Sequence, residues 1–251
     1  MSATGNMTPR HGDPYNYPII PDVPIIANPA PLGLAAFGIT TFVLSVYNAV
    51  GWGEPEKAPN NVIVGLALFY GGLAQLLAGM WEFKAGNTFG ATAFSSYGAF
   101  WLSFATILIP GSGVIDAFKT VPDPNHVGDA TYNQVNGSEL DTTIGVYLLG
   151  WCFLTFIFFL CTLRQNIASI LLFGMLTITF LLLAIGKLSH PNAKTGQQAG
   201  GYTGIFTAVI ALYIVLANLA NKEHTFFTLP IGRIAPIEND VLKKKKSEME
   251  V

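Results

Sequence analysis

Residues 167–186 read IASILLFGMLTITFLLLAIG, a stretch without a single Asp, Glu, Lys, Arg or His. A helix of this length, rising 1.5 Å per residue, spans about 30 Å, which is the thickness of the hydrocarbon core of a bilayer. Five more stretches have no charged residue or histidine, at 31–50, 62–81, 85–109, 142–163 and 199–221. Only 11% of the chain is charged, against about 25% in a typical soluble domain. The pattern predicts an all-α polytopic membrane protein with six transmembrane helices.

The order of these stretches also predicts the domain organisation. We expect spans at 31–50, 62–80, 88–109, 142–162, 167–186 and 201–220. They form a transmembrane domain over residues 28–220, between an N-terminal tail over 1–27 and a C-terminal tail over 221–251 that ends in a run of lysines, 243–246. The N-terminal tail is polar and proline-rich and has no signal-peptide pattern, so the first span is expected to direct insertion.

Basic residues predict the orientation of the chain. An even number of spans brings both termini to one side, and that side carries the basic excess. Its basic residues are Arg10, Lys84, Arg164, Lys222, Arg233 and Lys243 to Lys246, against Lys57, Lys119, Lys187 and Lys194 on the other side. The excess places both termini in the cytoplasm. The long connection between the third and fourth spans then faces outward, and its Asn136-Gly137-Ser138 sequon makes Asn136 a glycosylation candidate.

The residue types missing from the spans exclude several function classes. No span carries an acidic, basic or histidine side chain at its centre, and all four histidines fall in tails or loops. Proton relays, metal sites and catalytic triads depend on such groups. The sequence therefore favours neither an enzyme nor a protein with a metal or other cofactor. A net charge of −2 gives no basis for nucleic-acid binding.

Neutral polar groups remain as candidate binding residues. Asn87 and Thr88 open the third span, and N–H groups at a helix start attract anions. Asn28 precedes the first span, where it either caps that helix or faces a small anion. Gln75 lies deep in the second span and is costly to expose to lipid, so we expect it to face the bundle or a pore. The triplet 28–30, Asn-Pro-Ala, also suggests a water channel, but that fold needs two such triplets and the chain has one.

Several motifs resemble those of a known family. They are NPAPLGL at 28–34, FYGGLAQ at 69–75, AGMWEFK at 78–84, GNTFG at 86–90 and SYG at 96–98. Together they resemble the acetate uptake transporter family, which includes bacterial succinate–acetate permeases and fungal acetate and ammonium-outward transporters. The resemblance extends over about residues 28–232.

The resemblance implies a substrate path within each protomer of a hexameric ring. It implies a hydrophobic constriction of Phe37, Tyr97 and Leu176, with Ala211 on the last helix tuning selectivity. The implied substrates are acetate and similar small monocarboxylates, with succinate as a further candidate, and the implied partners are the lipid bilayer and other copies of the chain. The expected location is the plasma membrane.

Without buried charges, acetate is expected to pass over neutral donors. These are backbone N–H groups with Asn28, Gln75, Thr88 and Tyr97, and any proton dependence is assigned to acetic acid itself or to the rim charges Glu82 and Lys84. Two alternatives remain open from the sequence. One is export of ammonium or ammonia, and the other is a membrane sensor whose lysine-rich tail binds anionic lipid or a partner.

Overall fold

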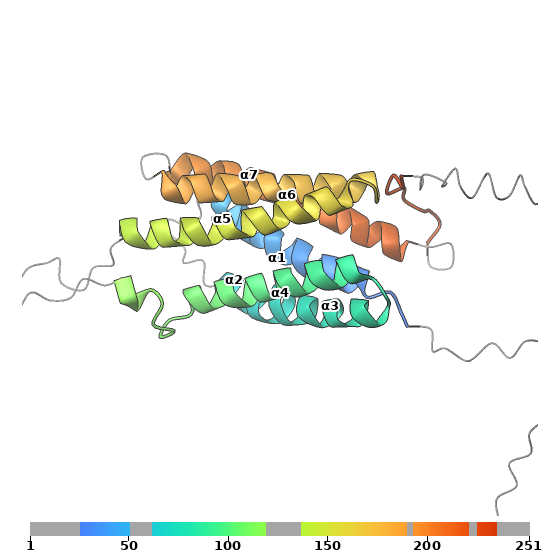
Figure 1. The fold of residues 1–251 in the computed structure, drawn as a ribbon, viewed down its shortest axis with the longest axis horizontal. Coiled ribbons are helices and arrows are strands. Elements are labelled where there is room, and N and C mark those ends of the chain that lie inside the picture. Colours follow the sequence, from blue (N-terminus) through green and yellow to red (C-terminus); the bar gives the residue numbers. More distant parts are fainter. Residues whose placement is uncertain (1–25, 51–61, 119–136, 190–192, 221–224, 235–251) are drawn as a thin grey trace, which may run out of the picture.

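The structure, a computed structural model, is a bundle of long helices (Figure 1). It describes residues 26–50, 62–118, 137–189, 193–220 and 225–234. The helices are α1 (Ala30–Val50), α2 (Val62–Leu68), the π-helix η1 (Phe69–Ala74), α3 (Gln75–Lys84), α4 (Thr88–Leu108), the short 3-10 helix η2 (Asp116–Phe118), α5 (Gly137–Thr162), α6 (Ile167–Leu188) and α7 (Ala193–Leu219). Since α2, η1 and α3 form one continuous rod, the helices make six spans in the predicted order.

Length and composition support the membrane assignment. Five helices in the described part of the chain are long and apolar enough to cross a bilayer: α1, the α2–η1–α3 rod, α5, α6 and α7. The remaining span, α4, has 21 residues like α1. It contains Ser95, Ser96 and Tyr97 in its first half, which lower its apolar character. The predicted all-α membrane fold is confirmed.

Helix α1 lies between two layers. One layer holds α2, α3 and α4, and the other holds α5, α6 and α7 (Figure 1). The main packing contacts join α1 to α7, α7 to α6, α6 to α5, and α3 to α4. Small residues allow the closest approaches. A methyl group added at Gly201 in α7 would overlap the backbone of Ala49 in α1, so this crossing requires glycine.

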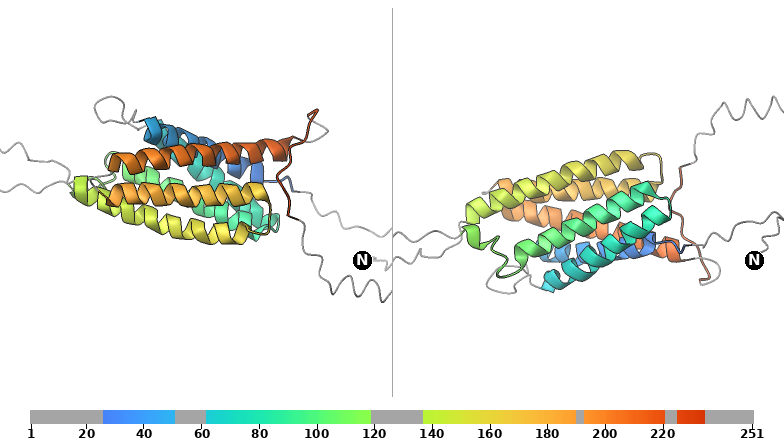
Figure 2. Two further views of the ribbon diagram at one scale, coloured as in Figure 1. Left: turned by 90° about the horizontal axis from the view of Figure 1, so that it is seen from above. Right: turned by 60° about the horizontal axis from the view of Figure 1, so that its bottom comes forward.

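The two ends of the bundle differ. The Asn28 end holds the start of α1, the α3–α4 and α5–α6 turns and the end of α7 (Figures 1 and 2). The Asn48 end holds the end of α1, the start of α5, the end of α6 and the start of α7. Both chain ends of the bundle therefore emerge at the Asn28 end, as an even number of spans requires.

Side chains bridge the space between α4 and α5. The Tyr97 hydroxyl donates to Thr155 Oγ1 over 3.0 Å, and Ser103 Oγ lies 2.7 Å from Tyr147 Oη. The Phe100 ring is 5.1 Å from that of Trp151. Aromatic side chains are long enough to hold two helices apart while filling the space between them, and such pairs add to the stability from burial alone. These side-chain contacts join α4 to α5 across the bundle interior.

Two helices start earlier than the charge-free pattern predicts. α5 begins at Gly137 rather than at 142, and α7 begins at Ala193 rather than at 201. Charged and polar residues are compatible with a helix beyond the hydrocarbon core, and here they are partnered. Asp141 of α5 pairs with Lys187, and Gln197 of α7 donates to Asn48 Oδ1 over 3.2 Å.

Residues 225–234, which fall in the predicted C-terminal tail, lie against the α5–α6 turn. The N–H of Ile167 donates to the carbonyl of Gly232 over 2.9 Å, and that of Ala168 donates to the carbonyl of Ile231 over 3.2 Å. These are the first two N–H groups of α6, which have no acceptor within their own helix. The segment thereby completes the hydrogen bonding at the start of α6.

Candidate functional site

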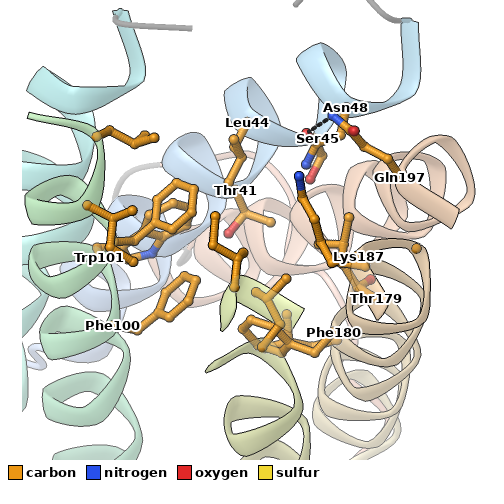
Figure 3. Close-up of a pocket in the computed structure, with 18 of the residues that line it drawn as sticks. Thr41, Leu44, Ser45, Asn48, Phe100, Trp101, Thr179, Phe180, Lys187 and Gln197 are labelled. Carbon is orange, nitrogen blue, oxygen red and sulfur yellow. Dashed lines mark hydrogen bonds between the residues drawn. The ribbon is translucent and has the colours of Figure 1, made fainter. Parts of the chain in front are cut away.

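A cavity of about 200 Å³ opens in the bundle toward the Asn48 end. We call it the vestibule; its walls come from α1, α4, α5, α6 and α7 (Figure 3). Its polar lining residues are Thr41, Ser45, Asn48, Thr179, Lys187 and Gln197. Its apolar lining includes Phe100, Trp101, Phe104, Leu148 and Phe180. The combination suits a small solute with one polar and one apolar end.

Two residues of the vestibule wall carry buried donors without a described partner. The Thr41 hydroxyl and the Trp101 indole N–H are buried, and neither has a hydrogen-bond partner among the described residues. A buried donor without a partner is unfavourable by about 1–3 kcal/mol. A solute oxygen that accepts from either group would remove this penalty.

A second, smaller cavity of about 20 Å³ lies toward the Asn28 end, and we call it the inner cavity. It is lined by Leu34, Phe37, Gln75, Ala93, Phe94, Tyr97, Leu172, Phe173 and Leu176. Only Gln75 and Tyr97 among these residues carry side-chain polar atoms. The inner cavity is therefore smaller and less polar than the vestibule.

Phe37 and Leu176 line both cavities and so form the wall between them. Both side chains are almost fully buried, as is Tyr97. The centroids of the Phe37 and Tyr97 rings are 5.6 Å apart. The structure therefore brings the three residues of the expected constriction together from α1, α4 and α6.

Neighbouring side chains fix the position of Tyr97. Its hydroxyl donates to Thr155 Oγ1, and the Thr155 hydroxyl in turn donates to the carbonyl of Trp151 over 2.7 Å. The rings of Phe158 and Phe173 lie 5.8 and 6.3 Å from its ring centroid. While the bond to Thr155 is made, the Tyr97 hydroxyl has no proton left to donate to a solute. In this conformation Tyr97 presents its ring rather than a donor to the path.

Gln75 is fully buried, and neither of its amide atoms has a partner among the described residues. It follows directly on the π-helix η1, and π-helical turns often occur at functional sites. Within η1, Gly71 has no space for a methyl group, which would overlap the side chains of Thr40 and Trp101. The close approach of η1 to α1 and α4 brings Gln75 to the wall of the inner cavity. Its buried amide is thus an unpartnered polar group in a residue that lines the same cavity as Phe37, Tyr97 and Leu176.

The other sequence candidates lie at the Asn28 end. Asn28 is exposed and its Oδ1 accepts from the N–H of Ala30 over 3.0 Å, so it caps the start of α1. Asn87 caps α4, since its Oδ1 accepts from the N–H of Gly90 over 3.0 Å. Thr88 is exposed on the first turn of the same helix. These three residues belong to helix starts rather than to the lining of the two cavities described.

The expected rim charges Glu82 and Lys84 differ in exposure. Lys84 is exposed on the last turn of α3, whereas Glu82 is only 2% exposed. Its Oε2 accepts from Asn87 Nδ2 over 2.8 Å. The α3–α4 turn thus encloses the Glu82 carboxylate, which is why it is not displayed at the surface as a rim charge would be.

The last two sequence candidates are Ala211 and Asn136. Ala211 is fully buried in α7 against α1, where a methyl group added at Gly38 would lie 3.4 Å from its Cβ. It is absent from the described lining of both cavities, so its expected influence on selectivity would act through the position of α1. Asn136 lies outside the described residues.

Sequence reasoning missed the vestibule. Thr41, Ser45 and Asn48 follow Phe37 at intervals of three or four residues, which places all four on one face of α1. This polar stripe within an apolar helix was the signal that could have revealed it. Among the residues that line the two cavities, Lys187 carries the one fixed positive charge.

Comparison with known proteins is consistent with this geometry. The sequence profile of the GPR1/FUN34/yaaH family matches residues 17–235. Acetate permease A of Emericella nidulans is 42% identical over 230 residues, which are 89% of this chain and 72% of that protein. Ammonia transport outward protein 2 of Saccharomyces cerevisiae is 43% identical over 209 residues, which are 81% of this chain and 67% of that protein.

A solved structure also matches. The bacterial acetate channel SatP superposes with a TM-score of 0.66 at 35% sequence identity, covering 83% of this chain and all of that one. The chain spans between 62% and 72% of the lengths of the fungal relatives it matches.

Proposed function

Because the chain belongs to the GPR1/FUN34/yaaH family, we propose that it transports acetate and similar small monocarboxylates across a membrane. The single observation that carries this proposal is the pair of cavities, about 200 and 20 Å³, separated by Phe37 and Leu176. The relatives that are named an acetate permease and an acetate channel support the choice of substrate.

The constriction suits a short carboxylate. Its walls are apolar, so a methyl group passes readily, and the room is too small for a long chain. Residues on either side carry buried neutral donors without a described partner: the Thr41 hydroxyl and the Trp101 N–H beside the vestibule, and the Gln75 amide beside the inner cavity. A small side-chain rotation would bring such a donor to the carboxylate. Neutral donors stabilise an anion without holding it as tightly as a fixed charge, and conduction requires binding that is weak enough for release.

The distribution of charge supports passage without a proton relay through the centre. In the helices that the structure describes, acidic and basic residues lie within five residues of a helix end: Glu82, Lys84, Asp116, Glu139, Asp141, Lys187 and Lys194. We therefore propose that acetate crosses the constriction as an anion, with proton dependence confined to acetic acid in solution or to Glu82 near the Asn28 end.

Uptake of labelled acetate into proteoliposomes tests both points. The pH should lie well above the pKa of acetic acid, so that diffusion of the neutral acid through lipid is slow. An inside-positive potential should accelerate uptake if the anion crosses alone, and should leave it unchanged if each anion carries one proton. Stoichiometric proton coupling that a single substitution within a span abolishes would refute the uncoupled mechanism.

Export of ammonium is the second candidate, and one relative is named an ammonia transport outward protein. The aromatic residues Phe37, Tyr97 and Phe100 along the path supply ring faces that attract cations. Efflux of labelled methylammonium from the same vesicles, compared with their uptake of acetate, decides between the two substrates.

Assembly and location complete the proposal. We propose that six copies form a ring in the plasma membrane with both termini in the cytoplasm, that residues 28–220 form the transport domain, and that 1–27 and 221–251 form the tails. Native mass spectrometry of the purified protein tests the hexamer. A glycan on Asn136, read as a mobility shift that disappears in Asn136→Gln, tests the orientation.

We further propose that the protein is a transporter rather than an enzyme or a membrane sensor. The support is that two cavities lie on opposite sides of the same residues, Phe37 and Leu176, since a sensor needs one binding pocket but no passage. Acetate binding without flux in proteoliposomes would favour the sensor.

A further inference from the structure

An ion pair lies at the mouth of the vestibule. Lys187, on the last turn of α6, donates from Nζ to Asp141 Oδ1 of α5 over 2.6 Å. The two side chains are 31% and 32% exposed, so the pair is partly open to solvent. Lys187 lines the vestibule, whereas Asp141 is absent from the described lining.

The rest of the mouth is neutral. Ser45 and Asn48 of α1 face α6 and α7 across the opening, and Gln197 of α7 donates to Asn48. Figure 3 shows the Lys187 side chain extending from α6 toward Ser45. A solute that enters from this end therefore passes the Lys187 ammonium group before it reaches the Thr41 hydroxyl and the constriction.

We propose that Lys187 collects the carboxylate at the vestibule mouth and that Asp141 limits how tightly it is held. This inference rests on the proposed transport of carboxylates. A half-exposed ion pair contributes little to stability, so a substrate carboxylate can replace that of Asp141 at small cost. An unpaired lysine beside an apolar cavity would retain the anion, whereas the carboxylate of Asp141 competes with it and favours onward movement. The two members of the pair thus act in opposite directions on anion affinity.

Four variants test this assignment: Lys187→Gln, Lys187→Arg, Asp141→Asn and the double variant Lys187→Gln/Asp141→Asn. The readout is the apparent KM for acetate uptake into proteoliposomes at low and high ionic strength. Asp141→Asn should lower KM and Lys187→Gln should raise it, each by roughly tenfold at low salt, which is the lower end of the effect that charges lining a cleft have on local ion concentration. Lys187→Arg should resemble the wild type.

Salt provides the second readout. At about 1 M salt the screening length falls to about 3 Å, so the differences between the variants should largely disappear. The double variant should show a KM between those of the single variants and the weakest salt dependence, because it has no charge at the mouth.

Three results would overturn the proposal. Equal increases in KM for both single variants, with a loss of thermal stability in both, would make the pair purely structural. A higher KM for acetate in Asp141→Asn with a lower one in Lys187→Gln would contradict the roles assigned to the two residues. Shifts that persist at high salt would exclude an electrostatic role. The wild-type flux reports on the proposed function separately, since its absence would refute transport itself.

Discussion

Leu176→Ala should broaden the range of acids that pass. The Leu176 side chain is 3% exposed and forms part of the wall between a cavity of about 200 Å³ and one of about 20 Å³. In an apolar site, discrimination against one extra methylene is about 1–3 kcal/mol, or roughly 10- to 200-fold. Propionate exceeds acetate by one methylene, and alanine removes more of the wall than that. The acetate-to-propionate flux ratio should therefore fall by about tenfold or more, and lactate should begin to pass.

The assay is uptake of labelled acetate, propionate and lactate into proteoliposomes at equal protein density. Truncating a buried leucine also destabilises a protein by about 2–5 kcal/mol, so a matched control is needed. Leu148→Ala provides it, because Leu148 is 6% exposed and lines only the vestibule. The reasoning is refuted if Leu176→Ala keeps the wild-type flux ratio, or if Leu148→Ala changes it equally.

Three further predictions concern individual residues. Gln75→Leu should leave the free energy of unfolding unchanged or raise it, because the amide has no described partner. Acetate flux should nevertheless fall by about tenfold, since a hydrogen bond to a charged group contributes about 1.5–3 kcal/mol. Undiminished flux would show that Gln75 does not contact the substrate. Tyr97→Phe should lower the free energy of unfolding by about 0.5–1.5 kcal/mol through loss of the hydrogen bond to Thr155, while acetate flux persists. Loss of flux in a folded variant would show instead that the Tyr97 hydroxyl binds the substrate. Gly232→Ala should lower the protection of the N–H groups of residues 225–234 against hydrogen exchange, because Gly232 has a φ of 66° and a methyl group there would lie 2.9 Å from Ile167. In the control Gly65→Ala the added methyl group meets open space, so protection should not change. Equal protection in both variants would contradict this.

The spans were predictable because the bilayer imposes a simple rule. The absence of charge over 167–186 identified α6 to within two residues, since α6 runs from Ile167 to Leu188. The same rule shortened α5, whose predicted start at 142 follows Asp141, and the polar residues Gln197 and Gln198 led to a predicted start of 201 for α7, which begins at Ala193. Helices continue past the hydrocarbon core, and there Asp141 of α5 forms an ion pair with Lys187 of α6. That pairing depends on three-dimensional packing, which the sequence pattern does not contain.

The candidate site was predictable in part. The family resemblance implied Phe37, Tyr97 and Leu176, of which Tyr97 lies in a quoted motif, and the structure places all three in the lining of the inner cavity. The high cost of exposing an amide to lipid correctly indicated that Gln75 faces inward. The π-helix that orients Gln75 has no apolar periodicity of its own. The hydrogen bond from Tyr97 to Thr155 joins residues far apart in the sequence, so neither feature could be read from local pattern.

Potential-driven acetate uptake into proteoliposomes tests the central claim most directly. Vesicles with the wild-type protein, at a pH where acetate is ionised, should take up labelled acetate faster than protein-free vesicles. An inside-positive potential should increase this uptake, and excess unlabelled acetate should compete with it. Uptake equal to that of protein-free vesicles, at every potential and with the protein shown to be folded and inserted, would contradict the account.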